Sequence, residues 1–432
     1  MQTQAQTRTW RTWLGMGFAD SLAPTVRYNM MTELWGTVAF GVFWAAAIQF
    51  IPVVMRRMGA GTELIALYQA QTYLGSILTS FSIVLMRRRR TKTFAVWCWA
   101  IGRSLFLAFA LVSQVKWLLI VTAAFWLMEA FPSPAYTRIV QAIYPEGVRG
   151  KAMSVVRLGM TAAIILVTPL AGWVLDQWGY RVLFPLAGGM GLLATWMFNR
   201  LDVDEGTLPS RQPRSMRSLW SILGTNRNFT IHLAGFTLFG LGALVGVAFY
   251  PVVQVDRLHL SYTQLGLLGT VQSIMWLLGF VYWGRAVDSR GGIWVMRANL
   301  AIAALVPFTY IWAQNGWMLL PAFIAQGIIS AGIDLGLLNT AIQLAEPDKV
   351  VEYAAVQATI IGVRGMVGPF LGVGLVHVGV SPTYVFALGA LLTLFAFWIS
   401  LQIRVELTPE QMRAKRQQLR FRWPLRFKSP RL

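Results

Sequence analysis

The feature that most constrains the fold of this chain is a series of long apolar segments. A membrane-spanning helix needs roughly 20 mostly apolar residues, and twelve such segments can be counted along the 432 residues. Apolar residues run continuously in each instead of alternating, which argues against a transmembrane β-barrel. The segments lie near residues 31–54, 64–86, 93–113, 117–143, 152–177, 181–199, 229–252, 263–284, 293–313, 317–344, 351–377 and 381–403.

Composition supports a polytopic membrane protein. Only 12% of the residues are charged and 56% are hydrophobic, whereas a soluble chain of this length would need far more charge to cover its surface. This balance excludes intrinsic disorder and a collagen-like chain. The single cysteine, Cys98, excludes an intrachain disulfide and a cysteine-based zinc cluster. We expect no metal and no cofactor.

The net charge of +20 is explained by its placement, without a nucleic-acid partner. Most lysines and arginines fall in segments that share one side of the membrane, which predicts that both termini are cytoplasmic. The basic tail, 404–432, suits an anionic leaflet surface. The first apolar run begins thirty residues in, so we expect no cleaved signal peptide and a bacterial cytoplasmic membrane location. The opposite side holds only Arg56, Arg57, Lys116, Arg181 and Arg257.

An internal repeat divides the spans into six and six. An offset of 200 residues pairs Pro169 with Pro369, Gly172 with Gly372 and Gly179 with Gly379, among others. The sequence therefore predicts an all-α fold of two pseudo-symmetric six-helix bundles, an architecture that holds solutes between its halves. The expected parts are a cytoplasmic segment (1–30), a first bundle (31–199), a linker (200–228), a second bundle (229–403) and the tail (404–432).

Three loop motifs carry a family resemblance. The loop after the eighth span reads G-x-x-x-D-x-x-G at Gly284, Asp288 and Gly291. The run P-E-x-x-R-G-x-A follows the fourth span, and the turn after the fifth span runs from Gly172 to Phe184. These motifs, at these places in a 6+6 layout, resemble the major facilitator superfamily over roughly residues 30–403. The second of them comprises Pro145, Glu146, Arg149, Gly150 and Ala152.

The resemblance implies the twelve-helix fold of that superfamily and transport of a small molecule. It also implies that Asp288 anchors a cytoplasmic gate, with Gly284 and Gly291 permitting the tight turn. The chain departs from the pattern in one place. The loop after the second span reads MRRRRTK and lacks the Asp and Gly of the first copy of the loop motif.

Four charges lie within the predicted spans, where each costs about 2.5–3.5 kcal/mol unless it is paired or lines a cavity. Arg103 and Glu129 fall at similar depths, roughly 15 and 18 Å from the same side. Asp334 and Arg364 fall at roughly 15 and 20 Å from the opposite side. The sequence predicts two ion pairs, one in each bundle.

Each pair has a structural and a functional interpretation. In the structural one, the charges only neutralise each other and fix helix register. In the functional one, Glu129 or Asp334 faces the cavity as a substrate or proton-coupling group, because a carboxylate freed from its partner in a dry site takes up a proton. Glu33 stays ambiguous, and Arg157 is interpreted as reaching the lipid headgroups.

Two function classes follow. The first is a secondary active transporter that moves a hydrophobic or amphipathic solute by alternating access, with proton coupling as one option, because no G-x-x-x-x-G-K-[ST] loop is present. The alternative is a non-transporting protein of the same fold that serves as an assembly factor, sensor or scaffold. An enzyme is not expected, since no catalytic cluster can form from His232, His259 and His377. Expected partners are membrane lipids and the small-molecule substrate, with a monomer favoured.

Overall fold

The computed structural model describes residues 22–78, 90–204, 224, 226–345 and 349–403, and every secondary-structure element in them is a helix. Eleven helical stretches of this part are long and apolar enough to cross a membrane. They agree closely with eleven of the twelve predicted segments. The remaining one, 64–86, overlaps α4 (Thr62–Gln71), and its residues 79–86 lie outside the described part. The predicted N-terminal segment, linker and basic tail also lie largely outside it.

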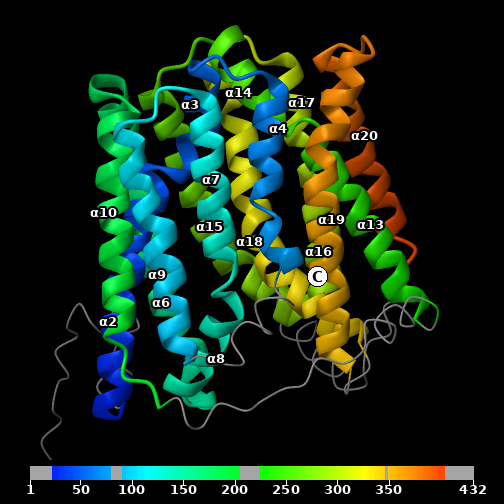
Figure 1. The fold of residues 1–432 in the computed structure, drawn as a ribbon. Helices are drawn as coiled ribbons and strands as arrows, with labels where there is room; N and C mark the ends of the chain where they lie inside the picture. Colours follow the sequence, from blue (N-terminus) through cyan, green and yellow to red (C-terminus); the bar gives the residue numbers. More distant parts are fainter. Residues whose placement is uncertain (1–21, 79–89, 205–223, 225, 346–348, 404–432) are drawn as a thin grey trace, which may run out of the picture.

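The helices form two groups that lie side by side (Figure 1). The first group comprises α2 (Pro24–Ala46), η2 (Ile48–Phe50), α3 (Ile51–Arg57), α4, α6 (Thr91–Ser104), η3 (Leu105–Ala110), α7 (Val115–Ala130), α8 (Ser133–Ile143), α9 (Glu146–Trp178) and α10 (Tyr180–Asn199). The second comprises α13 (Arg227–Val245), η5 (Val247–Phe249), α14 (Tyr250–Val252), η6 (Val253–Arg257), α15 (Tyr262–Arg290), α16 (Gly292–Ala303), α17 (Leu305–Trp312), η7 (Gly316–Leu319), α18 (Leu320–Leu344), α19 (Val350–His377) and α20 (Pro382–Ser400).

The backbone repeats at the offset of 200 residues that the sequence indicates. Helix α2 ends at Ala46 and α13 at Val245, and each continues through a short 3-10 turn. Left-handed backbone recurs as well. Gly179 and Gly379 have φ of 74° and 94°, while Gly59, at φ 86°, is matched by His259 at φ 48°. The two bundles therefore share several helix ends and turns.

Proline accounts for the matching breaks in the first and seventh spans. Pro52 and Pro251 lie in the first turn of α3 and of α14. Proline has no backbone N–H and clashes with the carbonyl four residues earlier, so an α-helix cannot run through it undisturbed. The resulting break in the α-helix lies five residues before each proline. It is at Ala47, whose φ and ψ are −122° and −62°, and at Gly246 in the second bundle.

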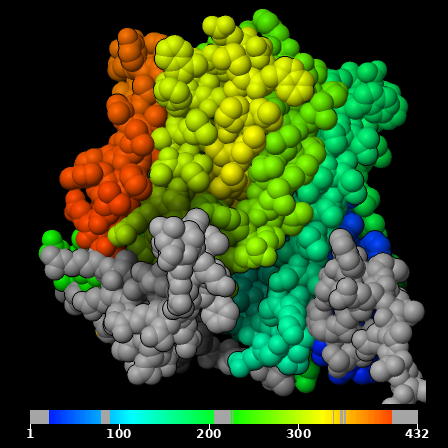
Figure 2. Space-filling view, turned by 180° about the vertical axis from the view of Figure 1, so that it is seen from behind, coloured from blue at the N-terminus to red at the C-terminus, as the bar shows by residue number. Residues whose placement is uncertain are grey.

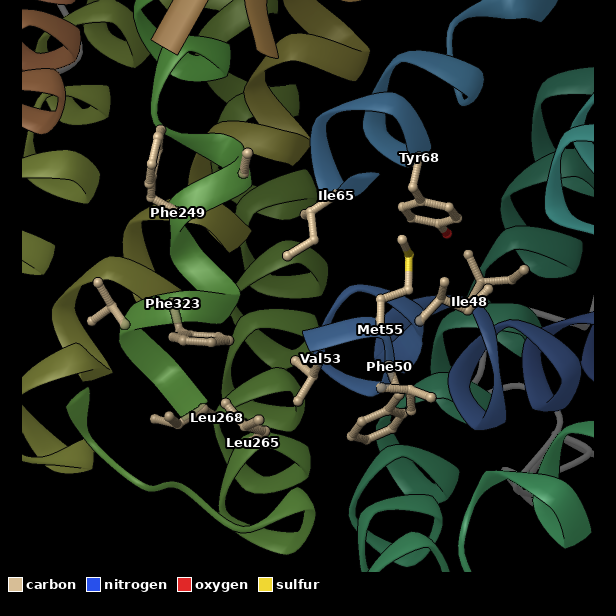
Figure 3. Close-up of a cluster of buried hydrophobic side chains, with 14 of the residues drawn as sticks. Ile48, Phe50, Val53, Met55, Ile65, Tyr68, Phe249, Leu265, Leu268 and Phe323 are labelled. Atoms are coloured by element: carbon tan, nitrogen blue, oxygen red, sulfur yellow. The ribbon is translucent and has the colours of Figure 1, made fainter. Parts of the chain in front are cut away.

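Apolar side chains from both bundles meet in one cluster near these breaks. Figure 3 shows Phe50, Val53 and Met55 of the first bundle in the same cluster as Leu265 and Phe323 of the second. Helices α9 and α15 pack along each other across the interface (Figure 2). A Cβ at Gly172 would lie 2.4 Å from the Tyr262 carbonyl oxygen, so glycine permits this backbone approach. The bundle interface is tightly packed at this level.

The left-handed histidine supplies a test of the repeat. Left-handed backbone costs an L-residue on the order of 1 kcal/mol, so His259→Gly should stabilise the protein by about 1 kcal/mol, read as a higher melting temperature in detergent. The matched change Gly59→Ala should lower it. Gly374→Ala is the control, because Gly374 lies in the helix α19 and a Cβ there meets nothing within 4 Å. This change should not lower the melting temperature. An unchanged melting temperature for His259→Gly would contradict the strain.

Candidate functional site

Two adjoining hollows form a cavity between the bundles, which we call the central cavity. Their volumes are about 350 and about 290 Å³, and they share Trp44, Gln49 and Gln272. The larger one adds residues of α9, α15 and α18, namely Ile164, Ser273, Trp276, Ser330, Ile333 and Asp334. The smaller one adds Phe50, Val53, Gln254, Leu265, Gly269 and Phe323.

The helix breaks place polar groups in this cavity. Gln49 belongs to the 3-10 turn η2, and Gln254 to η6, which is a π-helix. Gln254 Nε2 donates to the Tyr310 hydroxyl at 2.7 Å, and Gln49 Oε1 accepts from Thr168 Oγ1 at 3.3 Å. Discontinuous helices in corresponding positions of two repeats mark the binding site in many transporters.

Asp334 lines the cavity, but the structure does not bring it to Arg364. Asp334 Oδ2 accepts from Trp276 Nε1 at 3.2 Å, which ties α18 to α15. Arg157, which the sequence-based interpretation places at the lipid headgroups, is exposed on α9. The predicted pair is wrong for this conformation, because equal depth along two helices does not fix the direction in which each side chain points.

Arg364 instead faces α13. Its guanidinium donates to the Phe236 carbonyl and lies 3.9 Å from the centroid of the Phe236 ring. A Cβ at Gly240 would overlap this guanidinium, so the absence of a side chain there makes room for it. The Nε atom is buried without a hydrogen-bond partner in the part of the chain that the structure describes. The carbonyl and the aromatic ring thus replace the expected carboxylate.

The predicted pair of the first bundle is confirmed. Arg103 Nη2 lies 3.1 Å from Glu129 Oε1, and the two side chains are only 6% and 16% exposed. Arg103 also donates to Thr195 Oγ1 at 3.0 Å and lies over the rings of Phe40 and Trp99. Neither Arg103 nor Glu129 lines the central cavity described above. This geometry favours the structural interpretation, in which the pair holds α6, α7 and α10 together.

Glu33 is a buried carboxylate whose position the sequence left undecided. It is 4% exposed and accepts hydrogen bonds from the hydroxyls of Tyr136, at 2.6 Å, and Tyr144, at 2.5 Å. Tyr136 lies within α8, and Tyr144 directly follows the last residue of that helix in extended backbone, so helical spacing gave no signal for this pair. The contacts tie α2 to α8.

The loop motif after the fourth span stabilises a helix junction. Pro145 caps α9, and Glu146 lies in its first turn. Arg149 Nη2 donates to the Tyr144 carbonyl at 3.2 Å and, more weakly, to that of Gln141 at 3.4 Å. Gly150 has no neighbour within 4 Å of a Cβ. The motif therefore positions Tyr144, one of the two donors to Glu33.

The predicted gate residues lie at the end of α15. Gly291, at φ 85°, ends this helix and donates its N–H to the Val287 carbonyl at 2.8 Å. Gly284 lies in the last turns, with no neighbour within 4 Å of a Cβ. Asp288 is exposed and has no hydrogen-bond or ion-pair partner among the described residues. In this conformation the Asp288 carboxylate is accessible and makes no contact that would close a gate within the described residues.

The bundles are joined by polar contacts at the opposite end of the molecule, which we call the closed end. Arg56 pairs with Asp256, and Glu63 Oε1 lies 3.0 Å from His377 Nε2. Asp176 accepts from the backbone N–H of Tyr262, at 2.9 Å, and from the N–H and the hydroxyl of Thr263, both at 2.7 Å. A carboxylate at a helix N-terminus is favoured by the unsatisfied amides there, so Asp176 of the first bundle caps α15 of the second.

These features define a class of protein, an integral membrane carrier with a cavity between two six-helix bundles. The chain matches the family model of the Major Facilitator Superfamily over residues 34–261 and 233–432, and it belongs to that family. The twelve-helix fold predicted from the sequence is that of the family. The chain therefore has the fold and the family membership of membrane transport proteins.

Two curated relatives come from Escherichia coli (strain K12). The chain is 22% identical over 210 residues to the probable galactarate/D-glucarate transporter GudP, which is 42% of this chain and 45% of the relative. It is 33% identical over 73 residues to the probable galactarate/D-glucarate transporter GarP, or 17% of this chain and 16% of the relative. The matches thus span less than half the length of each relative.

Solved structures share the fold over most of the chain. A mutant of the nucleoside transporter NupG aligns with a TM-score of 0.70 at 11% identity, covering 87% of this chain and 99% of NupG. A bacterial homologue of the human lysosomal transporter Spinster, in an inward-facing and occupied conformation, aligns with a TM-score of 0.66 at 13% identity. That alignment covers 90% of this chain and 100% of the homologue.

The closed end can be tested by charge reversal. Asp256→Arg places two cations side by side and should loosen the seal, because like charges repel where opposite charges attracted. The reporter is Ser330→Cys in a Cys98→Ser background, labelled by a membrane-impermeant maleimide in vesicles. We expect no labelling from the closed end until Asp256→Arg is introduced.

The control is the swapped pair, Arg56→Asp with Asp256→Arg, which should restore protection. Labelling from the other end should stay the same in all variants and shows that they are folded. Protection that persists in Asp256→Arg would show that this ion pair does not seal the cavity.

Proposed function

We propose that the protein is a secondary active transporter that moves a small solute by alternating access through the central cavity. The observation that carries the proposal is that both bundles line one cavity, at the level of their matching helix breaks, while polar contacts join the bundles at the closed end. The sequence lacks a nucleotide-binding loop, so an ion or solute gradient supplies the energy.

The lining favours a hydroxyl-rich solute with an apolar face. Gln49, Gln254 and Gln272 offer amide groups that both donate and accept hydrogen bonds, and Trp44 and Trp276 offer flat apolar surfaces. This is one kind of the amphipathic solute expected from the sequence. NupG is described as a nucleoside transporter and GudP as a probable sugar-diacid transporter, and both kinds of solute are rich in hydroxyls.

Charge favours the neutral or cationic members of that class. Among the described residues that line the central cavity, Asp334 is the charged one, and none is Lys or Arg. A sugar diacid would bring two carboxylates beside Asp334 without a lining cation to pair with them, which is costly in a desolvated site. We therefore propose a nucleoside-like or polyol-like cargo in place of galactarate.

The membrane orientation of this proposal places the closed end outside. In the topology expected from the sequence, the lysines and arginines gather on the side that holds both termini, and such excess marks the cytoplasmic side. The Spinster homologue of the same fold is described as inward-facing. We propose a bacterial cytoplasmic membrane, cytoplasmic termini and an inward-facing conformation for this structure.

Asp288 is the proposed partner of α9 when the cytoplasmic side closes. Helices α9 and α15 are antiparallel neighbours, since Gly172 near the end of α9 contacts Tyr262 at the start of α15. Asp288 and the first turn of α9, which begins at Glu146, consequently lie at the same end of the molecule. Backbone amides of a first turn favour a carboxylate, so Asp288 can bind there once the bundles approach.

The cargo class can be tested by ligand-induced stabilisation. A ligand at 100 times its Kd stabilises the folded protein by about 2.7 kcal/mol, so a nucleoside or sugar alcohol should raise the melting temperature and galactarate should not. Gln49→Ala removes a hydrogen bond of about 1 kcal/mol and should weaken binding about fivefold.

The control for this test is Gln326→Ala, since Gln326 lies on α18 outside the cavity lining. A melting temperature that rises with galactarate alone would refute the proposed charge preference. Uptake of the stabilising ligand into proteoliposomes then separates a transporter from a scaffold of the same fold.

Asp334 is the proposed coupling group, because it is the carboxylate in the cavity. Asp334→Asn keeps the shape and an oxygen for Trp276 but cannot exchange a proton. It should abolish uptake driven by a pH gradient while leaving downhill exchange of the solute measurable in proteoliposomes.

Asp202→Asn is the matched control, because Asp202 contacts Asn29 only through its backbone N–H and carbonyl in the described structure. Arg364→Lys should leave the pH profile unchanged, since Arg364 does not contact Asp334. If uptake by the wild-type protein does not depend on pH, Asp334 does not couple transport to protons.

A further inference from the structure

A second hollow lies on the outside of the second bundle, close to the closed end. Its volume is about 300 Å³, and it shares no lining residue with the central cavity. It is formed where the turn before α15, the first turns of α15 and the start of α18 meet. The lining comprises Leu258, His259, Leu260, Gln264, Leu267, Leu268, Val271, Gln314, Asn315, Gly316, Trp317 and Leu320. We call it the interfacial pocket.

The pocket stands at one end of a lipid-facing stripe on α15. Leu267, Ile274, Leu278 and Val281 recur at the spacing of one helix face and are 36% to 56% exposed. From Leu267 to Val281 the stripe is about 21 Å long, which fits within the hydrocarbon thickness of a bilayer. The pocket therefore opens where the membrane's acyl chains meet the protein, and Val271 lies on the same face.

Polar residues form the rim of the pocket where the stripe ends. Gln264 is one turn before Leu267, and its Oε1 accepts from the Ser261 N–H at 2.9 Å. The Oδ1 of Asn315 accepts from the Met318 N–H at 3.1 Å. Because both amide oxygens are engaged in helix capping, the NH₂ groups remain as the hydrogen-bond donors of these side chains. The rim suits a ligand whose polar end carries acceptor oxygens.

We propose that the interfacial pocket binds a glycerophospholipid from the membrane leaflet at the closed end. One acyl chain lies against Leu267, Leu268 and Val271. The ester and phosphate oxygens accept from the amide groups of Gln264 and Asn315. A lipid meets both requirements at once, since its polar–apolar boundary falls at the same level as the boundary between rim and stripe.

The internal repeat supplies a natural comparison. The offset of 200 residues pairs Gln264 with Leu64 and Asn315 with Val115. The first bundle therefore has apolar residues where the second has Gln264 and Asn315, whereas Gln314 of the pocket is matched by Gln114. Trp117 and Trp317, in contrast, are the same in both halves. The donors are a property of the second bundle and not a requirement of the fold, which fits a binding role.

The pocket shares its helix turns with the seal of the closed end. The backbone N–H groups of Tyr262 and Thr263 donate to Asp176, and a Cβ at Gly266 would lie 2.8 Å from the Thr168 carbonyl oxygen. Gln264 and Leu267 lie on the other side of these same turns. A lipid held in the pocket thus packs directly behind the helix end that closes the cavity.

The test uses the full chain in phosphatidylethanolamine vesicles that contain a phosphatidylethanolamine with a photoactivatable diazirine in one acyl chain. After illumination, labelled peptides are mapped by mass spectrometry. We expect labelling of residues 264–271 and 314–320 to saturate as the labelled fraction rises. Labelling of residues 274–281, which contact the bulk lipid, should rise in proportion. Glycerol 3-phosphate should not displace the label, because it lacks an acyl chain.

Two variants remove the donors and keep the caps. Gln264→Glu retains the oxygen that accepts from Ser261, since Glu and Gln both complete a capping box, and Asn315→Asp likewise retains an oxygen for Met318. A hydrogen bond to a charged group contributes on the order of 1.5–3 kcal/mol, so each variant should weaken saturable labelling at least about tenfold. Gln114→Glu adds the same charge near the same end of the first bundle and should change nothing.

Three results would overturn the proposal. If labelling of the pocket residues and of the whole stripe rises in proportion to the fraction of labelled lipid, the protein contacts only bulk lipid there. Saturable labelling that survives in both Gln264→Glu and Asn315→Asp would show that the amide donors do not bind the headgroup. Displacement by glycerol 3-phosphate would assign the pocket to a soluble phosphate compound. The saturation measurement on the wild type stands even if a variant fails to fold.

Discussion

The structure depends on one constraint, that backbone N–H and C=O groups in a bilayer must find partners within the protein. Continuous helices satisfy it, and irregular backbone is tolerated at membrane depth only where protein or a cavity covers it. The breaks after Ala46 and Val245 obey this rule, since the turns that follow them face the central cavity and the cluster of Phe50 and Phe249. The prolines that interrupt the helices thus also determine where polar side chains can meet a solute.

The proposed alternating-access cycle requires a seal that opens and closes, and such a seal cannot be strong. The Arg56–Asp256 and Glu63–His377 contacts are partly exposed, and exposed ion pairs contribute about 0–1 kcal/mol each. Asp176 adds three hydrogen bonds to the start of α15, again at the edge of the protein. Several weak contacts at one end hold the bundles together there, and a solute's binding energy of a few kcal/mol is comparable with their sum. The apolar cluster beneath them is the more durable part of the interface.

The sequence predicted the features that depend only on position along the chain or along a helix axis. Span positions follow from hydropathy, the repeat from the offset of 200, and the Arg103–Glu129 pair from matching depths on helices joined by a short loop. The prediction that failed depended on the direction in which a side chain points around the helix axis. Asp334 and Arg364 have matching depths as well, yet Asp334 faces Trp276 of α15 and Arg364 faces Phe236 of α13. The contacts of Glu33 with Tyr136 and Tyr144 were missed because the tyrosines lie beyond a break in the fourth span, between α7 and α8.

The absence of an Asp334–Arg364 contact in this structure bears on the proposed coupling role of Asp334. An Asp334 engaged with Arg364 would have to lose an ion pair in a low-dielectric site before it could bind a proton or a solute, at a cost of several kcal/mol. With Arg364 held by the Phe236 carbonyl and ring, Asp334 keeps one described hydrogen bond and lies in the cavity. It can therefore respond to a proton or a cationic group without that prior step.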